Sequence, residues 1–278
     1  MKKIAKSLKV RYHYAMILLK ELVHTDFKLK YQDSILGYFW SVIKPLFLFA
    51  IIYMFFGVLL GIGRGVEHWP VALIAGIVLW QFFTDVTGNG LKAIVANGGL
   101  LRKIKFPRYI IIVSGTVSSL ISLGINSIVV IIFGIVSGVP FTPEIFFAIP
   151  LVIEVFLFSL GVAFFLGAIY VKFRDIQHIW EIITRGLFYG SAIIFPVNMI
   201  MGFATYGPLI ATIVLMNPVA QVIQDVRHLA VSPTINSLWT VSGENIWLYL
   251  IPIILSVAVF ILGALYFKKR APYFAEDV

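Results

Sequence analysis

Six apolar segments dominate this sequence, and each has the character of a helix that crosses a lipid bilayer. They occupy residues 41–60, 69–87, 109–137, 145–171, 187–202 and 246–267. A membrane-spanning helix needs about 20 mostly apolar residues, and a soluble domain could not hide so much apolar surface from water. Charged residues make up only 13% of the chain, about half the share in an ordinary soluble domain. The sequence therefore predicts an all-α integral membrane protein with six transmembrane helices.

The basic residues are distributed unevenly around these segments. Of the 22 lysines and arginines, 20 lie before or at the start of the first segment, between the second and third, between the fourth and fifth, or after the last. The opposite side holds only Arg64 and Arg227. Because basic residues accumulate on the cytoplasmic side of membrane proteins, we expect both termini in the cytoplasm. This bias explains the net charge of +9 without nucleic-acid binding.

Residues 14–35 precede the first segment and have one apolar and one polar helical face. The apolar face holds Leu18, Leu19, Leu22, Val23, Phe27 and Leu29, whereas Lys20, Glu21, His24 and Lys28 lie opposite. This pattern predicts an amphipathic helix on the inner membrane surface, within a cytoplasmic or interfacial region 1–40; a merely solvated helix is the alternative. Scattered charges in this region argue against a cleaved signal peptide. We expect one transmembrane domain over residues 1–278, with six spans in 41–267 and a cytoplasmic tail at 268–278.

The stretch 186–224 carries no charge. It is too long for one membrane span, and its proline and glycine residues interrupt it too often for two. The interruptions are Pro196, Gly202, Gly207, Pro208 and Pro218. Irregular backbone at membrane depth has to be buried in protein or line a wet cavity. We therefore expect the fifth helix to be followed by an outer re-entrant segment, with part of 203–230 against a pathway or another subunit. Two full spans would put the basic cluster Lys268-Lys269-Arg270 outside, which its charge disfavours.

The sequence contains no recognisable catalytic, metal or nucleotide motif. It has no cysteine, its five histidines are not paired at metal-ligand spacing, and the phosphate-binding string G-x-x-x-x-G-K-[ST] is absent. Asp85 and Glu154 lie within or near spans. For each carboxylate two explanations are open: a role in a proton relay, or a position close to a membrane interface. We expect no enzymatic activity, no metal site and no cofactor in this chain, so any ATP and magnesium would be bound by another subunit.

Two short inner loops combine basic and aromatic residues in a way that suits docking to a cytoplasmic partner. Their candidate docking residues are Leu101, Arg102, Lys103, Ile104, Phe106 and Pro107 in the first, and Phe173, Arg174 and Asp175 in the second. Anchoring to lipid head groups is the alternative. Aromatic residues in the span walls suit a path for sugars, whose C–H faces stack on rings, although most such residues pack or face lipid. The candidates for such a path are Trp40, Tyr53, Phe188, Tyr189 and Phe195.

At these residues the chain resembles the permease subunits of type-2 ABC exporters that move cell-surface polysaccharides. The resemblance covers nearly the whole length and is carried by residues 31–45, 101–107, 173–175 and 216–219, with Arg227 beyond. Asn217 and Pro218 match the outer re-entrant segment of the family, although Val219 stands where the family often has leucine. The resemblance extends to exporters of O-antigen, teichoic acid, capsule and rhamnose-rich glycans, and leans towards wall teichoic acid or rhamnan.

The resemblance implies a homodimer of this chain in the bacterial cytoplasmic membrane, with two ATP-binding subunits. The substrate would be an undecaprenyl-linked glycan that enters from the inner leaflet, among membrane lipids, and ATP-driven closure would reach the spans through the two inner loops. One alternative is an exporter of drugs or small lipids with the same fold. Another is a membrane enzyme acting on lipid-linked sugars, which should show clustered carboxylates or histidines.

Overall fold

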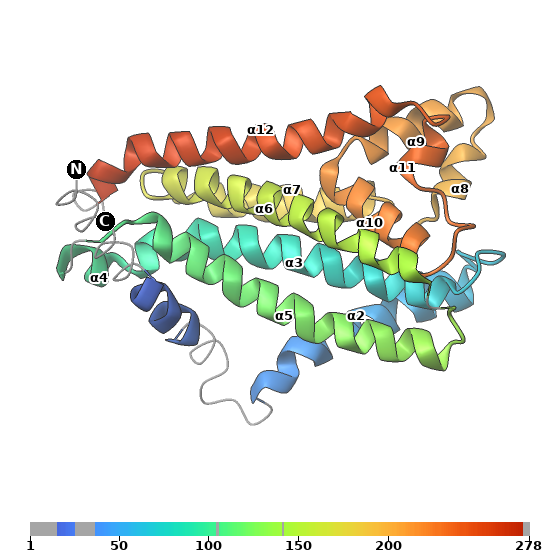
Figure 1. Ribbon diagram of the computed structural model, residues 1–278, viewed down its shortest axis with the longest axis horizontal. Coiled ribbons are helices and arrows are strands. Elements are labelled where there is room, and N and C mark those ends of the chain that lie inside the picture. The colour runs from blue at the N-terminus through green and yellow to red at the C-terminus, as the bar shows by residue number, and fades with distance from the viewer. Residues whose placement is uncertain (1–15, 26–36, 104–105, 141, 275–278) are drawn as a thin grey trace.

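The computed structural model describes residues 16–25, 37–103, 106–140 and 142–274. Within these ranges every regular element is a helix, and there is no strand. Long helices run side by side along the longest dimension, and short helices gather at one end (Figure 1). The prediction of an all-α architecture is confirmed for this part of the chain.

Five helical segments are long and apolar enough to cross a membrane, and they coincide with five of the six predicted spans. Their elements are α2 (Trp40–Ile52) with the π-helix η2 (Tyr53–Leu59), α3 (Trp69–Ala96), α5 (Tyr109–Val136), η3 (Pro143–Phe147) with α6 (Ala148–Tyr170), and α12 (Ile246–Arg270) with η5 (Ala271–Tyr273). The short helices η1 (Gly37–Phe39) and α4 (Gly98–Lys103) precede α2 and α5.

The fifth predicted segment differs from the structure. A helix does run here, but it is α7 (Ile176–Gly190), which starts before residue 187, and the chain is irregular from residue 191 to 196. Pro196 cannot donate a backbone hydrogen bond and restricts the residue before it, which disfavours helix at this point. The charges of Glu181 and Arg185 had excluded the first half of α7 from an apolar segment.

Five short helices follow α7 and form the end of the molecule where Figure 1 shows them clustered. They are α8 (Val197–Met201), η4 (Ala204–Tyr206), α9 (Gly207–Leu215), α10 (Pro218–Ala230) and α11 (Leu238–Val241). The pair α9 and α10 is apolar enough to count as one span, but it is bent by 103°. The bend lies at Asn217, whose Oδ1 accepts the N–H of Val219 at 3.1 Å, and Pro218 then starts α10.

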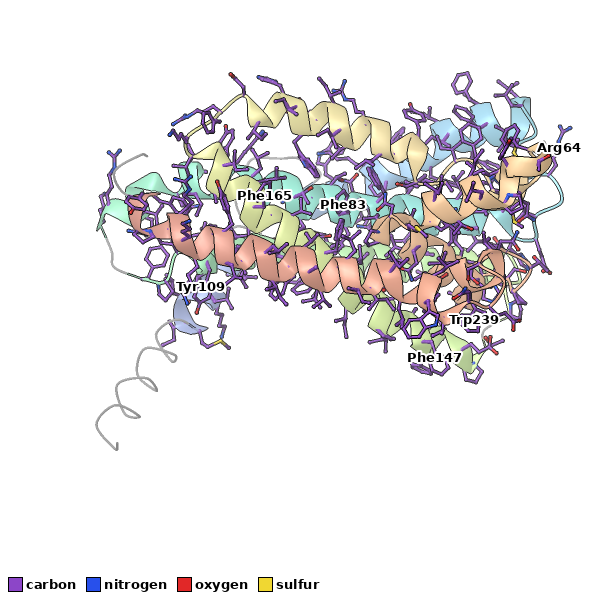
Figure 2. All side chains as sticks on the ribbon, turned by 90° about the horizontal axis from the view of Figure 1, so that it is seen from above. Arg64, Phe83, Tyr109, Phe147, Phe165 and Trp239 are labelled. Carbon is purple, nitrogen blue, oxygen red and sulfur yellow. The ribbon has the colours of Figure 1, made fainter. Side chains whose placement is uncertain are left out.

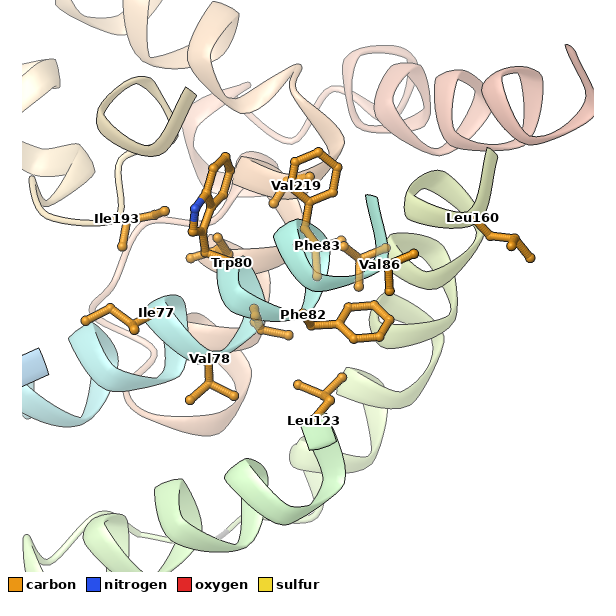
Figure 3. Close-up of a cluster of buried hydrophobic side chains, with 14 of the residues drawn as sticks. Ile77, Val78, Trp80, Phe82, Phe83, Val86, Leu123, Leu160, Ile193 and Val219 are labelled. Atoms are coloured by element: carbon orange, nitrogen blue, oxygen red, sulfur yellow. The ribbon is translucent and has the colours of Figure 1, made fainter. Parts of the chain in front are cut away.

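Helix α3 is the centre of the bundle, with 78% of its most apolar window buried against 11% for α2 and η2. Trp80, Phe82 and Phe83 extend from it towards Leu123 of α5 and Val219 of α10 (Figure 3). Small residues let neighbouring helices approach closely, as is usual in membrane bundles. At the contact of α6 with α12, a Cβ on Gly161 would lie 2.5 Å from the Cα of Phe260. The core therefore depends on close packing around α3 and between α6 and α12.

The described part of the predicted N-terminal helix, residues 16–25, is helical. Leu18, Leu19, Leu22 and Val23 are half-buried, whereas the polar side chains between them are exposed. This is the two-faced pattern that the sequence predicts for these residues. Phe27, Leu29 and the rest of residues 26–36 lie outside the described ranges, so the position of this helix on a membrane surface stays a prediction.

Candidate functional site

One end of the molecule collects basic residues from three separate parts of the chain. Helix α4, the turn between α6 and α7, and the end of α12 all lie there (Figure 1). Arg102, Lys103, Arg174 and Asp175 are exposed. Figure 2 shows Tyr109 near this end and Arg64 at the opposite one. The structure thus brings the two predicted docking loops to one face.

The two loops differ in how far they expose apolar side chains. Leu101 is only 7% exposed, and Phe106 is half-buried against the main core, next to half-buried Pro107. Phe173 is 59% exposed, with the Lys172 ammonium 5.5 Å from its ring centre. Ile104 lies outside the described residues. Of the aromatic residues predicted for docking, Phe173 is the one available to a partner, and the docking role of both loops stays a prediction.

Helix α7 has two chemically different faces. Its apolar face turns towards the bundle and is formed by Ile176, Ile179, Trp180, Ile183 and Leu187. Trp180 Nε1 donates a hydrogen bond to Thr87 Oγ1 of α3 at 3.2 Å, and its ring meets Phe83 at 6.1 Å. These contacts hold one side of α7 to the centre of the bundle.

The other face of α7 is exposed and carries the charged side chains of the helix, beside Ile182, which is 71% exposed. This face carries His178, Glu181 and Arg185, and Gln177 Nε2 donates to Glu181 Oε1 at 2.9 Å. None of the residues of α7, which the structure describes in full, is buried. A charged face is costly in contact with lipid tails. Helix α7 runs alongside the long apolar helices (Figure 1), and its charged side chains suit contact with water or a polar partner.

The five aromatic residues predicted to line a sugar path do not form one cluster. Phe195 meets Phe56 of η2 at 6.1 Å, and Tyr53 stacks on Phe49 one turn earlier. Tyr189 is 60% exposed at the end of α7 and contacts the half-buried Phe188. Tyr53 thus lies at the start of η2, Phe188 and Tyr189 at the end of α7, and Phe195 in the irregular stretch that follows.

Trp40 lies apart from the other four aromatic residues, at the start of α2. There it lines a small cavity of about 70 Å³ together with Lys44, Asp85 and Asn126. Asp85 accepts a hydrogen bond from Gln81 Nε2 at 2.7 Å. The cavity is polar and lies between α2, α3 and α5.

Arg227 of α10 is the largest fully buried side chain of the described residues and 0% exposed. Its Nε donates to the carbonyl of Ala72 in α3 at 2.7 Å. Its Nη1 and Nη2 donate to the carbonyls of Ala192 and Ile193 at 3.0 and 2.8 Å. The guanidinium also lies 5.4 Å from the ring centre of Trp69. Of the two basic residues that the sequence places opposite the basic end, Arg227 is therefore buried in the protein, whereas Arg64 is exposed.

Two of the three carbonyls that Arg227 binds, those of Ala192 and Ile193, belong to the break after α7. Ala192 has a left-handed backbone with φ of 51°, so the helix cannot continue. Gln224 Nε2 also donates to Ala192 O at 2.9 Å, and Asn217 Nδ2 donates to Ser191 Oγ at 3.3 Å. A cation is favourable at the negative end of a helix. Arg227 and Gln224 of α10 thus bind backbone carbonyls of the irregular stretch after α7, and Asn217 at the start of α10 binds the Ser191 side chain there.

Two acidic side chains of the described residues are buried, Asp225 of α10 and Glu154 of α6. Asp225 accepts hydrogen bonds from Gln221 Nε2 at 2.6 Å and from the Leu238 N–H at 3.0 Å. Glu154 of α6 accepts from Ser256 Oγ of α12 at 3.4 Å. Among the described residues, no group of three or more histidine, aspartate and glutamate side chains is arranged to hold a metal ion. These acids join neighbouring helices.

The sequence model of one protein family, described as ABC-2 type transporter, matches residues 17–229. The chain belongs to the ABC-2 type transporter family. It is 30% identical to the O-antigen export system permease protein RfbA of Klebsiella pneumoniae over 273 residues, or 97% of this chain and 99% of that one. It is 26% identical to RfbA of Myxococcus xanthus over 190 residues, which cover 68% and 72% of the two chains. The Polysialic acid transport protein KpsM of Escherichia coli is 24% identical over 206 residues, covering 72% and 79%.

Sequence reasoning missed several residues that shape this ABC-2 type transporter chain. The sequence predicts the fifth helix only from residue 187, so it misses the exposed face of α7. His178, Glu181 and Arg185, which form this face, do recur at helical spacing. Gln224 and Asp225 stand beside Arg227 and are preceded by a long uncharged stretch, which is a usable signal for a buried polar contact. Trp180 gave no signal of its own, since its partner Thr87 lies 93 residues away.

Proposed function

We propose that this chain is the permease subunit of an ATP-driven exporter that moves a cell-surface polysaccharide across the bacterial cytoplasmic membrane. Membership of the ABC-2 type transporter family supports a transport role. The relatives named as O-antigen export and polysialic acid transport proteins support a polysaccharide cargo. The single observation that carries the proposal is the exposed, charged face of α7 beside apolar spanning helices.

The polar path is proposed to form between two copies of the chain. Helices α2 and η2 present exposed apolar side chains such as Phe47 and Phe55, and only 11% of their most apolar window is buried. A second copy packed across α2 and α7 would cover this surface and enclose the polar face of α7. Glu181, Arg185 and Tyr189 would then line a wet path, with hydrogen-bonding groups and a ring for sugar stacking. A homodimer therefore accounts for both exposed surfaces at once.

ATP is proposed to be bound by a separate subunit, two copies of which would dock at the basic end. The chain has no phosphate-binding loop, and exposed Phe173, with Arg102 and Arg174, gives that end the aromatic and arginine groups that docking sites favour. Closure of the ATP-binding subunits would move the loops as rigid bodies and shift α7. The cargo is proposed to be an undecaprenyl-linked glycan of the wall teichoic acid, O-antigen or rhamnan kind.

The proposed topology counts α7 as the fifth crossing and α12 as the sixth. The bent pair α9 and α10 is then a re-entrant segment on the outer side, and both termini are cytoplasmic. Arg227 supports this arrangement, because a segment that enters and leaves from one side needs its exposed backbone carbonyls paired within the protein. Arg227 of α10 pairs two such carbonyls, those of Ala192 and Ile193, in the irregular stretch that leads into this segment.

The experiment that tests the function makes the exposed face of α7 apolar. The variant Glu181→Leu with Arg185→Leu should assemble with the ATP-binding subunit, yet export little polysaccharide in cells that lack the natural permease. Surface polysaccharide is measured by antibody or by radiolabelled sugar. Glu244→Leu, at an exposed loop position, is the matched control and should export normally. Normal export by the α7 variant would contradict the proposed path, and transport of small lipids without any polysaccharide would contradict the proposed cargo.

A further inference from the structure

An apolar groove runs along the bundle side of α7, between α7 and α12. Its volume is about 680 Å³, within the usual range of about 300–1,000 Å³ for small-molecule sites. Ile179 and Ile183 of α7 form one wall, and Leu255 and Leu262 of α12 form the other. Figure 2 shows Phe165 and Phe83, which also line the groove, between the ribbons of these two helices. The groove can accept a hydrocarbon chain but offers little to a sugar.

A second cavity of about 390 Å³ lies at the basic end, beyond the end of this groove. Lys172, Arg270, Tyr273 and Val171 line it. Both cations are exposed and belong to different helix ends, so they face one space from two sides. Clusters of basic side chains at the ends of spanning helices are typical binding sites for lipid phosphates. This cavity therefore suits an anionic head group.

A row of side chains connects the two cavities. The Arg270 guanidinium lies 5.7 Å from the ring centre of Tyr266, and Tyr266 meets Phe165 of the groove at 5.3 Å. Along α12, the row Leu262, Tyr266 and Arg270 repeats at four-residue spacing, which keeps its members on one helical face. A single molecule with a charged head and an apolar chain would match this order of surfaces.

We propose that the cavity and the groove together bind one phosphate-headed lipid of the surrounding membrane. Its phosphate lies between Lys172 and Arg270, and one hydrocarbon chain lies between α7 and α12. None of the residues of α7, all of them described, is buried. The hydrocarbon chain of the lipid therefore supplies packing for α7 that the protein itself lacks. The lipid is distinct from the exported cargo, since the groove is on the face of α7 opposite Glu181 and Arg185. The proposal does not depend on which molecule the protein transports.

The test measures lipid binding to the purified full-length chain by native mass spectrometry. Dioleoyl phosphatidylglycerol is titrated against the natural chain and against Lys172→Glu with Arg270→Glu. A basic side chain near an anionic lipid contributes about fivefold in affinity, so loss of both should weaken binding about thirtyfold. The control is Lys268→Glu with Lys269→Glu, which makes the same charge change at neighbouring exposed positions that do not line the cavity. This control should lose clearly less affinity than the cavity variant, because Lys268 and Lys269 do not line the cavity and cannot contact a phosphate held there.

Two further arms separate head-group from chain recognition. Leu262→Trp fills the groove and should reduce binding, whereas Leu265→Trp, on an exposed leucine of the same helix that does not line the groove, should not. Dioleoylglycerol, which lacks the phosphate, should bind weakly, and inorganic phosphate should not displace the lipid. Equal binding of dioleoylglycerol, displacement by inorganic phosphate, or equal loss in the Lys268 and Lys269 control would each overturn the proposal. None of these readings depends on export, so they stand apart from failure of the proposed function.

Discussion

Arg227 shows how a single side chain determines where the backbone can break inside the bundle. It donates to carbonyls of α3 and of the segment after α7 at once. We predict that Arg227→Met, which keeps the volume but removes every donor, destabilises the fold by about 4 kcal/mol or more, because it removes three hydrogen bonds from a charged group, each worth about 1.5–3 kcal/mol. The measurement is the melting temperature of the purified chain in detergent.

Two further variants define this effect. Arg64→Met removes an exposed arginine and should leave the melting temperature unchanged. Arg227→Lys keeps the charge but cannot reach three carbonyls with one compact ammonium, so its melting temperature should fall between those of the natural chain and Arg227→Met. Equal melting temperatures for Arg227→Met and Arg64→Met would show that the buried network contributes nothing measurable.

Gly161 is a second residue at which one atom decides packing. A Cβ here would lie 2.5 Å from the backbone Cα of Phe260, and backbone cannot rotate out of the way as a side chain can. We predict that Gly161→Ala separates α6 from α12 and costs about 1–3 kcal/mol, measured by thermal unfolding in detergent. Gly186→Ala is the control, since a Cβ on Gly186 of α7 meets nothing within 4 Å. That control should match or exceed the natural stability, because alanine favours helix over glycine.

At the scale of elements, the turn between α6 and α7 is the better exposed of the two docking loops. We predict that Phe173→Ala weakens binding of the ATP-binding subunit about thirtyfold, as is common when an aromatic anchor is truncated. The measurement is the apparent affinity of the purified subunits. Phe146→Ala removes a phenylalanine that is 70% exposed near the other end of α6, and it should bind normally. Unchanged binding by Phe173→Ala would show that the docking contact lies at α4 and not at the turn between α6 and α7.

At the scale of the whole molecule, the direction of insertion can be tested because the chain has no cysteine. Single cysteines at Lys103 and Lys269 should resist an impermeant maleimide in intact cells, whereas cysteines at Arg64 and Glu244 should react. All four positions are exposed in the structure, so protection reports the side of the membrane rather than burial in the protein. Labelling of the Lys103 position from outside would reverse the proposed orientation.

Hydropathy and charge determined the features that depend on short stretches of sequence. Five spanning helices, the basic end and the break at Asn217 and Pro218 were all predictable, since each rests on residues adjacent in the chain. Membership of the ABC-2 type transporter family also follows from sequence. The start of α7 was not predictable in this way, because segment hydropathy is averaged over all sides of a helix. One charged face lowers that average, even when the opposite face is apolar.

Only the tertiary structure decided which polar groups are buried and what they bind. From its charge Arg227 only counted as one of two basic residues opposite the basic end, yet its Nε binds a carbonyl 155 residues away. Phe106 and Phe173 have similar sequence surroundings, but the first packs on the core and the second is exposed. Burial depends on neighbours brought together by folding, whereas hydropathy is a property of one segment. The lipid groove, formed where α7 meets α12, exists for the same reason only in the folded chain.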